Sequence, residues 1–272
     1  MTTAFVLGGG GVLGAAEVGM LRALFEAGIA PDLILGTSVG ALNGAMVARD
    51  PTLAVIERLT ELWQDAQTSR TIADRPLRSV RRAVSTGTHL YSADPMQRRL
   101  IAEFGETTFE ELPIRLQVCA ASIERAAEHW FTTGRLVDAI MASAAVPGLL
   151  PPARVGDEHF LDGGIVNSIP LGRAVALGAG RVFVLQVGRI DRPLEVPRRP
   201  WEVARVSFEI ARRHRFAREL AEVPEGVEAH VLPARGTTSR DDSLRAHRDF
   251  SGVRRRIDAS YEASRDYLAA VL

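Results

Sequence analysis

The chain has 272 residues, of which 46% are hydrophobic and 24% are charged, so it is too apolar to be intrinsically disordered. Its 33 basic residues balance its 33 acidic ones, and a formal net charge of zero excludes a global basic field for nucleic acid or a bilayer. The single cysteine, Cys119, cannot form an intrachain disulfide. The sequence also lacks the layout of a secretory signal and an apolar stretch of the ~18 residues that span a bilayer. We therefore expect a cytoplasmic globular protein.

The first half of the chain alternates short apolar runs with helical patterns. Four apolar residues precede four consecutive glycines, and apolar residues then recur at helical spacing from Val18 to Phe25. The elements expected here are strand 4–7, a helix that Gly28 ends, strand 33–35 and helix 41–48. Two strands that each feed a helix through a glycine turn predict an α/β sheet with largely parallel strands.

The second half repeats this pattern before a more helical end. The later expected elements are strand 114–121, helices 137–145 and 170–177, strand 181–187, helix 202–221, strand 228–232 and a last helix from about 253 to 272. Arginines among small polar residues at 69–91 predict an exposed cap, and prolines at 191–201 predict a connector. We expect a catalytic domain at residues 1–190 and a C-terminal helical extension at residues 191–272, packed on the same domain.

A serine lies in the turn between the second strand and its helix, in the run Gly36-Thr37-Ser38-Val39-Gly40. Small residues flank it, which fits a strained strand-to-helix turn whose serine hydroxyl points out of the sheet. The helix N-terminus adds positive potential beside that oxygen. Such a string also arises by chance, as a tight turn with an incidental serine. The interpretation of Ser38 as a nucleophile therefore depends on the strand before the turn and the helix after it.

The glycines after the first strand have two interpretations. Gly9-Gly10-Gly11-Val12-Leu13-Gly14 satisfies the GxGxxG pattern of dinucleotide-binding proteins. In that fold the ribose-binding acid follows the second strand, whereas Asp32 precedes it. The amides of Gly9, Gly10 and Gly11 serve equally well as an oxyanion hole, because no side chains block them. A non-enzymatic nucleotide-binding module stays an alternative, which thermal stabilisation by NAD or ATP would reveal.

An acyl-transfer serine needs a base, and Asp162 ends an apolar run before Gly163 and Gly164. Taken alone, an Asp in such a place is more often a surface turn residue. A second enzyme class is the Ser-Asp-His α/β-hydrolase, whose triad order fits Ser38 and Asp162 followed by a histidine. The histidines that come later in the chain are His214, His230 and His247. Without ligand spacing among the histidines, no metal is expected.

Three segments, in their order and spacing, are similar to the signature elements of the patatin-like phospholipases: the glycine run from Gly9 to Gly14, the Ser38 turn, and Asp162-Gly163-Gly164. The segments 143–152 and 167–170 also resemble that family. The resemblance covers about residues 4 to 190. It departs at Leu13, where many bacterial relatives carry Arg or Lys, so a charge that could orient a head group is missing.

The resemblance implies a three-layer α/β/α fold with a mostly parallel central sheet. It also implies a carboxylic ester hydrolase of the phospholipase or lysophospholipase type, which uses a Ser38-Asp162 dyad through an acyl-enzyme intermediate. Ser38 is then the nucleophile and Asp162 the base, with no cofactor or metal. The resemblance also implies that Gly9, Gly10 and Gly11 form the oxyanion hole. The glycines that support these motifs are Gly14, Gly36, Gly40, Gly163 and Gly164.

The expected partner is a lipid ester, with peripheral contact at the inner face of an anionic membrane. A helical projection of residues 201–221 predicts one stripe against the catalytic domain: Val203, Val206, Ile210, Ala217 and Ala221. It predicts the membrane side as Arg205, Arg212 and Arg215 beside Phe208 and Phe216. The alternative packs both rings under the final helix and pairs the arginines with Glu202, Glu209 and Glu219. The sequence predicts no head group, acyl chain or oligomeric state.

Overall fold

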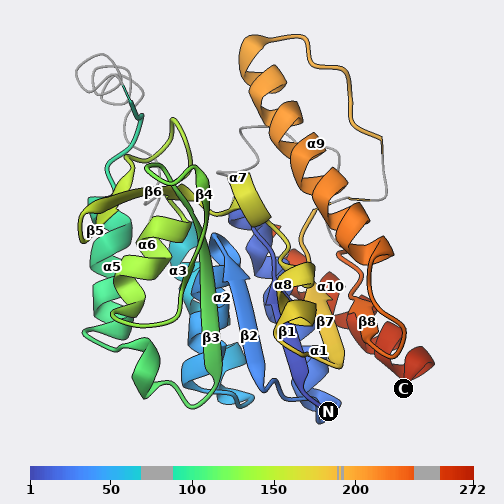
Figure 1. Cartoon of the computed structure of the whole chain (residues 1–272). Helices are drawn as coiled ribbons and strands as arrows, with labels where there is room; N and C mark the ends of the chain where they lie inside the picture. Colours follow the sequence, from blue (N-terminus) through green and yellow to red (C-terminus); the bar gives the residue numbers. More distant parts are fainter. Residues whose placement is uncertain (69–87, 189, 191–192, 236–251) are drawn as a thin grey trace.

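The computed structural model describes residues 1–68, 88–188, 190, 193–235 and 252–272, and a central sheet forms its middle layer (Figure 1). The strands are β1 (Thr3–Leu7), β2 (Leu33–Thr37), β3 (Arg115–Ser122), β4 (Ala127–Phe131), β5 (Ala153–Val155), β6 (Glu158–Asp162), β7 (Arg181–Leu185) and β8 (Glu228–Val231). Their order is β5-β6-β3-β2-β1-β7-β8, and β4 also pairs with β3. Strands β3, β2, β1, β7 and β8 are parallel to one another, whereas β4, β5 and β6 pair antiparallel.

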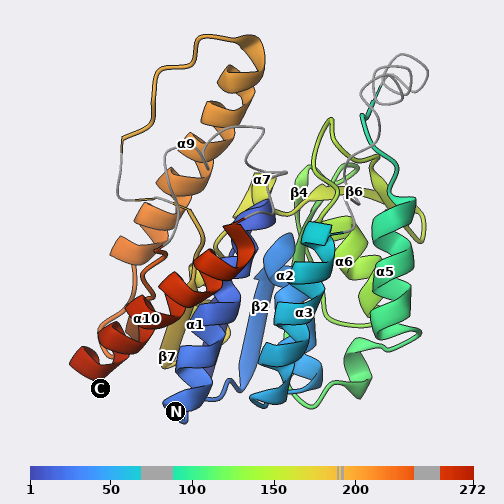
Figure 2. The same ribbon diagram turned by 180° about the vertical axis from the view of Figure 1, so that it is seen from behind.

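Helices cover both faces of the sheet (Figures 1 and 2). One face carries the 3₁₀ turn η1 (Gly11–Gly14) and the helices α1 (Ala15–Glu26), α2 (Val39–Arg49), α3 (Ala54–Thr68), α5 (Asp94–Phe104), α6 (Leu136–Ser143) and α10 (Val253–Val271). The other carries α7 (Gly164–Asn167), α8 (Leu171–Ala176) and α9 (Pro200–Ala221). A further 3₁₀ turn, η2 (Phe109–Glu111), precedes β3. The expected three-layer α/β/α fold with a mostly parallel sheet is confirmed.

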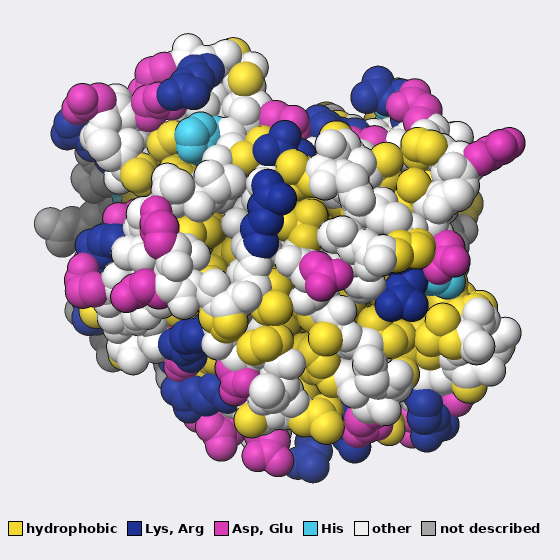
Figure 3. Space-filling model, turned by 60° about the horizontal axis from the view of Figure 1, so that its bottom comes forward, with side chains coloured by type: hydrophobic (Ala, Val, Ile, Leu, Met, Phe, Trp, Pro, Cys, Tyr) yellow, Lys and Arg dark blue, Asp and Glu magenta, His cyan; other side chains and the backbone are white. Residues whose placement is uncertain are grey.

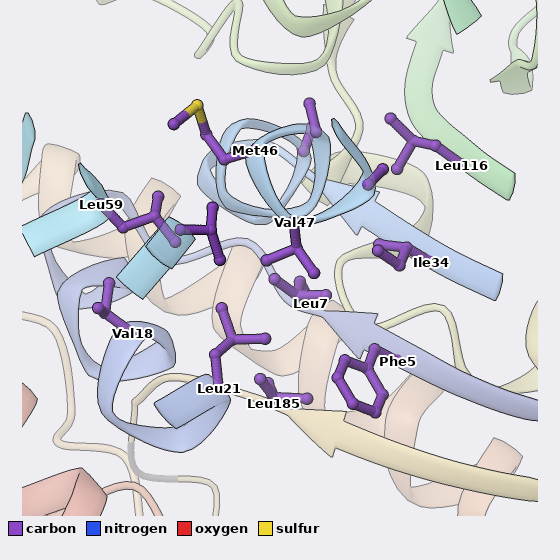
Figure 4. Packing of buried hydrophobic residues seen from close by; sticks show 14 of the residues in the cluster. Phe5, Leu7, Val18, Leu21, Ile34, Met46, Val47, Leu59, Leu116 and Leu185 are labelled. Carbon is purple, nitrogen blue, oxygen red and sulfur yellow. The ribbon is translucent and has the colours of Figure 1, made fainter. Parts of the chain in front are cut away.

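The two faces bury separate hydrophobic cores because side chains alternate along each strand. On β1, Phe5 and Leu7 enter the larger core under α1 and α2 (Figure 4). Ala4 and Val6 point the other way and pack with Leu171 of α8. With every residue of β1 and β2 buried, these strands sit at the centre of the molecule. The turns after them are thereby fixed at the carboxyl edge of the sheet.

The chain beyond residue 190 adds to both the sheet and the larger helical layer. β8 extends the sheet beside β7, and α10 packs along α1. The two helices approach closely at Gly19, where a Cβ atom would lie 2.1 Å from the carbonyl oxygen of Ile257. The Ser260 hydroxyl donates a hydrogen bond of 2.6 Å to the carbonyl of Ala16. Division of the chain at residue 190 stays a prediction.

The orientation predicted for α9 is wrong. Val203 and Ile210, which were expected to pack inward, are 49% and 54% exposed. Arg212 and Phe216, which were expected to point outward, are buried. Phe216 is buried, as the alternative predicts, but it packs in the smaller core, on the face of the sheet opposite α10, and Phe208 is 37% exposed. Of the five residues predicted for the inner stripe, Val206 is buried, and the other four are exposed.

Two further regions bear on the sequence-based expectations. Most of the arginine-rich segment expected as a cap, residues 69–87, lies outside the described residues. The remainder, at residues 88–91, contacts the loop after α6 through a bridge between His89 and Gly148. Within the part of the chain that the structure describes, no helix combines the length and apolarity needed to cross a membrane.

Candidate active site

Ser38 occupies a strained turn between β2 and α2. Its backbone has φ 56° and ψ −121°, a left-handed region that a residue with a Cβ atom rarely adopts. The neighbours must be small: a Cβ on Gly36 would lie 2.6 Å from the carbonyl oxygen of Gly40, and a Cβ on Gly40 would lie 2.2 Å from that of Leu7. The close approach of α2 to β1 thus requires both glycines and aims Ser38 at the carboxyl edge of the sheet.

A second serine, Ser143, forms a hydrogen bond with the backbone of this turn. The hydroxyl of Ser143 accepts a 2.7 Å hydrogen bond from the backbone N–H of Ser38 and donates one of 2.5 Å to the carbonyl of Cys119 on β3. Ser143 is fully buried at the end of α6. The strained backbone of Ser38 is therefore bonded to the neighbouring strand through one side chain. Sequence patterns assign Ser143 no role beyond its place in a segment that resembles the family.

Asp162 lies at the end of β6, directly opposite Ser38. Its Oδ2 is 2.6 Å from Ser38 Oγ and accepts the hydrogen bond of that hydroxyl. Its Oδ1 accepts a 2.7 Å hydrogen bond from the N–H of Gly164, which fixes the plane of the carboxylate. Ser38 and Asp162 are 8% and 5% exposed. The structure thus brings together two residues that are 124 positions apart in the chain.

Burial of Asp162 changes its basicity. Removal from water raises the pKa of its carboxyl group to about 6, and the hydrogen bonds from Ser38 and Gly164 offset this only in part. An ordinary aspartate has a pKa near 4 and is a weak acceptor for a serine proton. At about 6, the carboxylate is still ionised at neutral pH and is a stronger base. This shift suits a general base that works near pH 7.

The glycine loop between β1 and α1 lies against the Ser38 turn. A Cβ on Gly9 would be 3.5 Å from the Cβ of Ser38, which places the loop beside this serine. The N–H of Gly9 is already bonded, because it donates to the carbonyl of Ser168 at 2.9 Å. Gly9 therefore anchors the loop and has no free amide for an oxyanion. Of the three expected donors, Gly10 and Gly11 remain candidates.

Gly10 is the position where a side chain fits least. A Cβ there would lie 2.0 Å from Cγ2 of Val187, so Gly10→Ala must displace either the valine or the loop. Because one lost oxyanion donor costs ~3 kcal/mol of transition-state stabilisation, we expect this variant to lose about 10²–10³-fold in kcat for an ester substrate. Thermal unfolding monitored by circular dichroism is the control for the fold. Activity close to that of the parent protein would remove Gly10 from the oxyanion site.

The other expected motif residues are structural supports. Gly14 packs against Val39, because a Cβ on Gly14 would lie 2.6 Å from Cγ2 of Val39. A Cβ on Gly163 would lie 2.2 Å from the carbonyl oxygen of Cys119. Gly164 supplies the N–H that bonds Asp162. Leu13, where the resemblance departs, is buried in the larger core.

The structure argues against the Ser-Asp-His triad. Ser38 bonds Asp162 directly, which leaves no place for an imidazole between them. His230 stacks on Phe183 inside the larger helical layer and lies 3.2 Å from the hydroxyl of Tyr267. His214 is exposed on α9, and His247 lies outside the described residues. Among the residues that the structure describes, no cluster of three or more potential metal ligands occurs.

Asp32, the candidate for the ribose-binding acid of a dinucleotide fold, lies at the amino edge of the sheet. Asp32 Oδ2 accepts a 2.8 Å hydrogen bond from the N–H of Thr3, at the amino ends of β1 and β2. The glycine loop lies at the opposite, carboxyl edge. The carboxyl end of β2, where a ribose-binding acid would follow, instead carries Ser38.

The family model and the similar sequences agree on the type of domain. A family model described as Patatin-like phospholipase matches residues 5–175. Over 194 residues, the chain is 31% identical to "Lysophospholipase nte1" of Aspergillus terreus and 34% identical to "Patatin-like phospholipase domain-containing protein 7" of Rattus norvegicus. These matches cover 68% and 69% of this chain but only 12% and 14% of the relatives. The solved structure of VipD from Legionella pneumophila aligns with a TM-score of 0.46 at 12% identity, over 99% of this chain and 66% of that one.

Proposed function

Because the chain belongs to the patatin-like phospholipase family, we propose that it is a serine lipid acyl hydrolase that works through a Ser38-Asp162 dyad. The observation that carries the proposal is the 2.6 Å hydrogen bond from Ser38 Oγ to a buried carboxylate whose second oxygen is fixed by Gly164. Such a pair supplies a nucleophile and its base without a third residue.

The geometry suits acyl transfer in two steps. Ser38 Oγ attacks the ester carbonyl while its proton passes to Asp162 Oδ2, and the amides of Gly10 and Gly11 bind the oxyanion that develops. The C–O bond to the alcohol then breaks, and Asp162 returns the proton to the leaving oxygen. In the second step, water loses a proton to Asp162 as it attacks the acyl-Ser38 ester. Collapse of that intermediate releases the fatty acid and returns the proton to Ser38.

We propose lysophospholipids as the substrate class. The basis is that a relative at 31% identity over 194 residues carries the name lysophospholipase, and that the family model spans residues 5–175, which include Ser38 and Asp162. The experiment is to measure fatty acid release from matched lysophospholipid, diacyl phospholipid and monoacylglycerol substrates. We expect the highest kcat/KM with the lysophospholipid. Faster turnover of the neutral glyceride would assign the site to glyceride esters, and release from none of the three would refute the hydrolase.

The raised pKa of Asp162 predicts how activity depends on pH. The base must be ionised to accept the proton of Ser38, so kcat/KM should rise with pH through about 6 and reach a plateau above it. Below this value each pH unit should cost about tenfold, because the protonated carboxyl cannot act as a base. A pH profile with a soluble ester substrate tests this. An acid limb near pH 4, where an exposed aspartate titrates, would contradict the role of burial.

We also propose peripheral contact with an anionic membrane through the α9 tip, a surface formed by Val196, Arg198, Arg199, Val203 and Ile210. Val196 is 84% exposed, and both arginines are exposed beside it. Val203 and Ile210 share one side of the helix because they are seven residues apart. In Figure 1 the tip rises beyond the carboxyl edge of the sheet, where the site lies. Apolar side chains among arginines suit an interface with anionic lipid.

The path from the α9 tip to the site runs along the same helix. Phe208 is 37% exposed, and its Cζ lies 2.8 Å from the position of a Cβ on Gly164, next to Asp162. By contrast, the face shown in Figure 3 intersperses arginines with acidic side chains over hydrophobic patches. Phe208 therefore links the helix that carries the α9 tip to the site.

Vesicle co-sedimentation tests this surface. The double variant Val203→Ser, Ile210→Ser should bind vesicles less than the parent protein, because it loses the apolar side chains that enter the acyl region. Binding of the parent protein should rise with the anionic lipid fraction and fall with salt. The matched control is Ile101→Ser on α5, which is 42% exposed on the other layer. Equal binding by the control and the double variant would place the lipid contact elsewhere.

A further inference from the structure

Glu17 lies beneath the glycine loop with its side chain wholly removed from solvent. Its Oε2 accepts a 2.7 Å hydrogen bond from Asn43 Nδ2, whereas Oε1 accepts none from the residues that the structure describes. An ionised carboxylate in such a place would lack most of the hydrogen bonds that its charge requires. A neutral carboxylic acid fits these surroundings.

Asn43 connects this carboxyl group to both halves of the site. The same Nδ2 donates to the carbonyl of Gly14 at 3.0 Å, where the glycine loop ends, and Oδ1 accepts a 3.2 Å hydrogen bond from Trp63 Nε1 on α3. Asn43 lies on α2, the helix that begins directly after Ser38. The loop that supplies the oxyanion donors and the helix that follows the nucleophile are therefore joined through one buried amide.

We propose that Glu17 is a positioning residue that works as a neutral acid: Oε2 accepts from Asn43, Oε1 carries the proton, and the glycine loop is thereby held in register with Ser38. The proposal rests on the proposed hydrolase function for its kinetic consequence. Its structural claim, a protonated carboxyl group at neutral pH, stands independently of any activity.

The surroundings of Glu17 support this state. Burial raises the pKa of its carboxyl group well above the usual value, while the Asn43 amide and the backbone of Gly8 lower it to a smaller extent. Both of these groups are uncharged. The charged side chains of the adjacent helices include Arg58 on α3, which pairs with Glu61 and Glu103, and Arg256 on α10. Ionisation at alkaline pH would leave an uncompensated negative charge under the loop.

Infrared difference spectroscopy tests the protonation state without reference to activity. The spectrum of the parent protein at neutral pH, minus that of Glu17→Gln, should contain the C=O stretch of a protonated carboxylic acid. It should lose that band at alkaline pH as the carboxylate bands appear. Carboxylate bands already present at neutral pH would overturn the proposal.

The rate of Ser38 labelling by a fluorescent alkylphosphonate tests the positioning role. Glu17→Gln is isosteric with the neutral acid, so it should keep the rate of the parent protein at neutral pH and should not share its alkaline loss. Glu17→Leu fills the site but cannot accept from Asn43, and a misplaced loop should lower its rate by about 10²-fold. Thermal unfolding confirms that each variant is folded; if Glu17→Leu is not, Glu17→Gln still decides.

A Glu17→Gln variant as slow as Glu17→Leu, or one with the same alkaline loss as the parent protein, would overturn the positioning role. A parent protein that does not label at any pH would instead count against the hydrolase. In that case the infrared band still decides whether Glu17 is neutral.

Discussion

Ser38→Ala is expected to abolish release of fatty acid from every lipid ester, with a loss at least as large as that of any other single substitution in the chain. The attacking oxygen disappears, whereas the backbone bond from Ser38 N–H to Ser143 is retained. Alanine keeps a Cβ atom at the strained position, so the turn is no more strained than before. Turnover of a lysophospholipid by the purified variant is the measurement.

The matched control for this variant is Ser207→Ala, which removes an exposed hydroxyl from α9. It should retain full turnover, because Ser207 lies outside the dyad. Ser38→Ala should also have the circular dichroism spectrum and unfolding temperature of a folded protein. Substantial turnover by a folded Ser38→Ala variant would show that another residue is the nucleophile.

Asp162→Asn should lower kcat by about 10²–10⁴-fold and leave KM little changed, which is the usual consequence of losing a general base. An amide keeps the size of the side chain and can still accept from Gly164, but it cannot take the proton of Ser38. The acid limb near pH 6 should also disappear, because the group that titrates there is gone. Steady-state kinetics across pH measure both effects.

Asp157→Asn provides the comparison, since Asp157 is fully exposed in the turn between β5 and β6. Its kinetics should match those of the parent protein. If Asp162→Asn kept more than about a tenth of the parent activity, Asp162 would not be the base on the scale expected for such a residue. If it lost activity but kept the acid limb, the group that titrates near pH 6 would be a different one.

The parts of the site that the sequence predicted are those with a local signature. The Ser38 turn follows a buried strand and opens a helix, so its glycines and its strained serine can be recognised within a few residues. Asp162 gave a weaker local signal, because an Asp before two glycines also fits a surface turn. Only the order and spacing of the motifs along the chain identified it, and the structure then placed it 2.6 Å from Ser38 Oγ.

The orientation of α9 could not be predicted because two opposite sides of the helix are both partly apolar. Val203 and Ile210 lie on one side and Phe216 on another, and periodicity does not decide which of them meets the sheet. The smaller core takes Phe216, and Arg212 is buried where its Nη2 donates a 2.6 Å hydrogen bond to the carbonyl of Val187. That carbonyl lies in the segment after β7, two residues beyond Leu185, which no local pattern in α9 reveals.

Residues that act through long-range hydrogen bonds were also missed or misassigned. Ser143 bonds the backbone of Ser38 from 105 positions away, and the amide of Gly9 is occupied by Ser168 from the far side of the sheet. Glu17 appears in the sequence as one acidic residue in the first turn of an ordinary helix. Its burial follows only from α2, α3 and α10 packing around α1.

The most direct test of the dyad is to identify the residue that a fluorescent alkylphosphonate modifies. The reagent forms a stable ester with an activated serine, and digestion followed by mass spectrometry locates the adduct. The Ser38-Asp162 dyad predicts one adduct, on Ser38, with labelling absent in Ser38→Ala and strongly slowed in Asp162→Asn. An adduct on a different serine, or equal labelling of the Ser38→Ala variant, would contradict it.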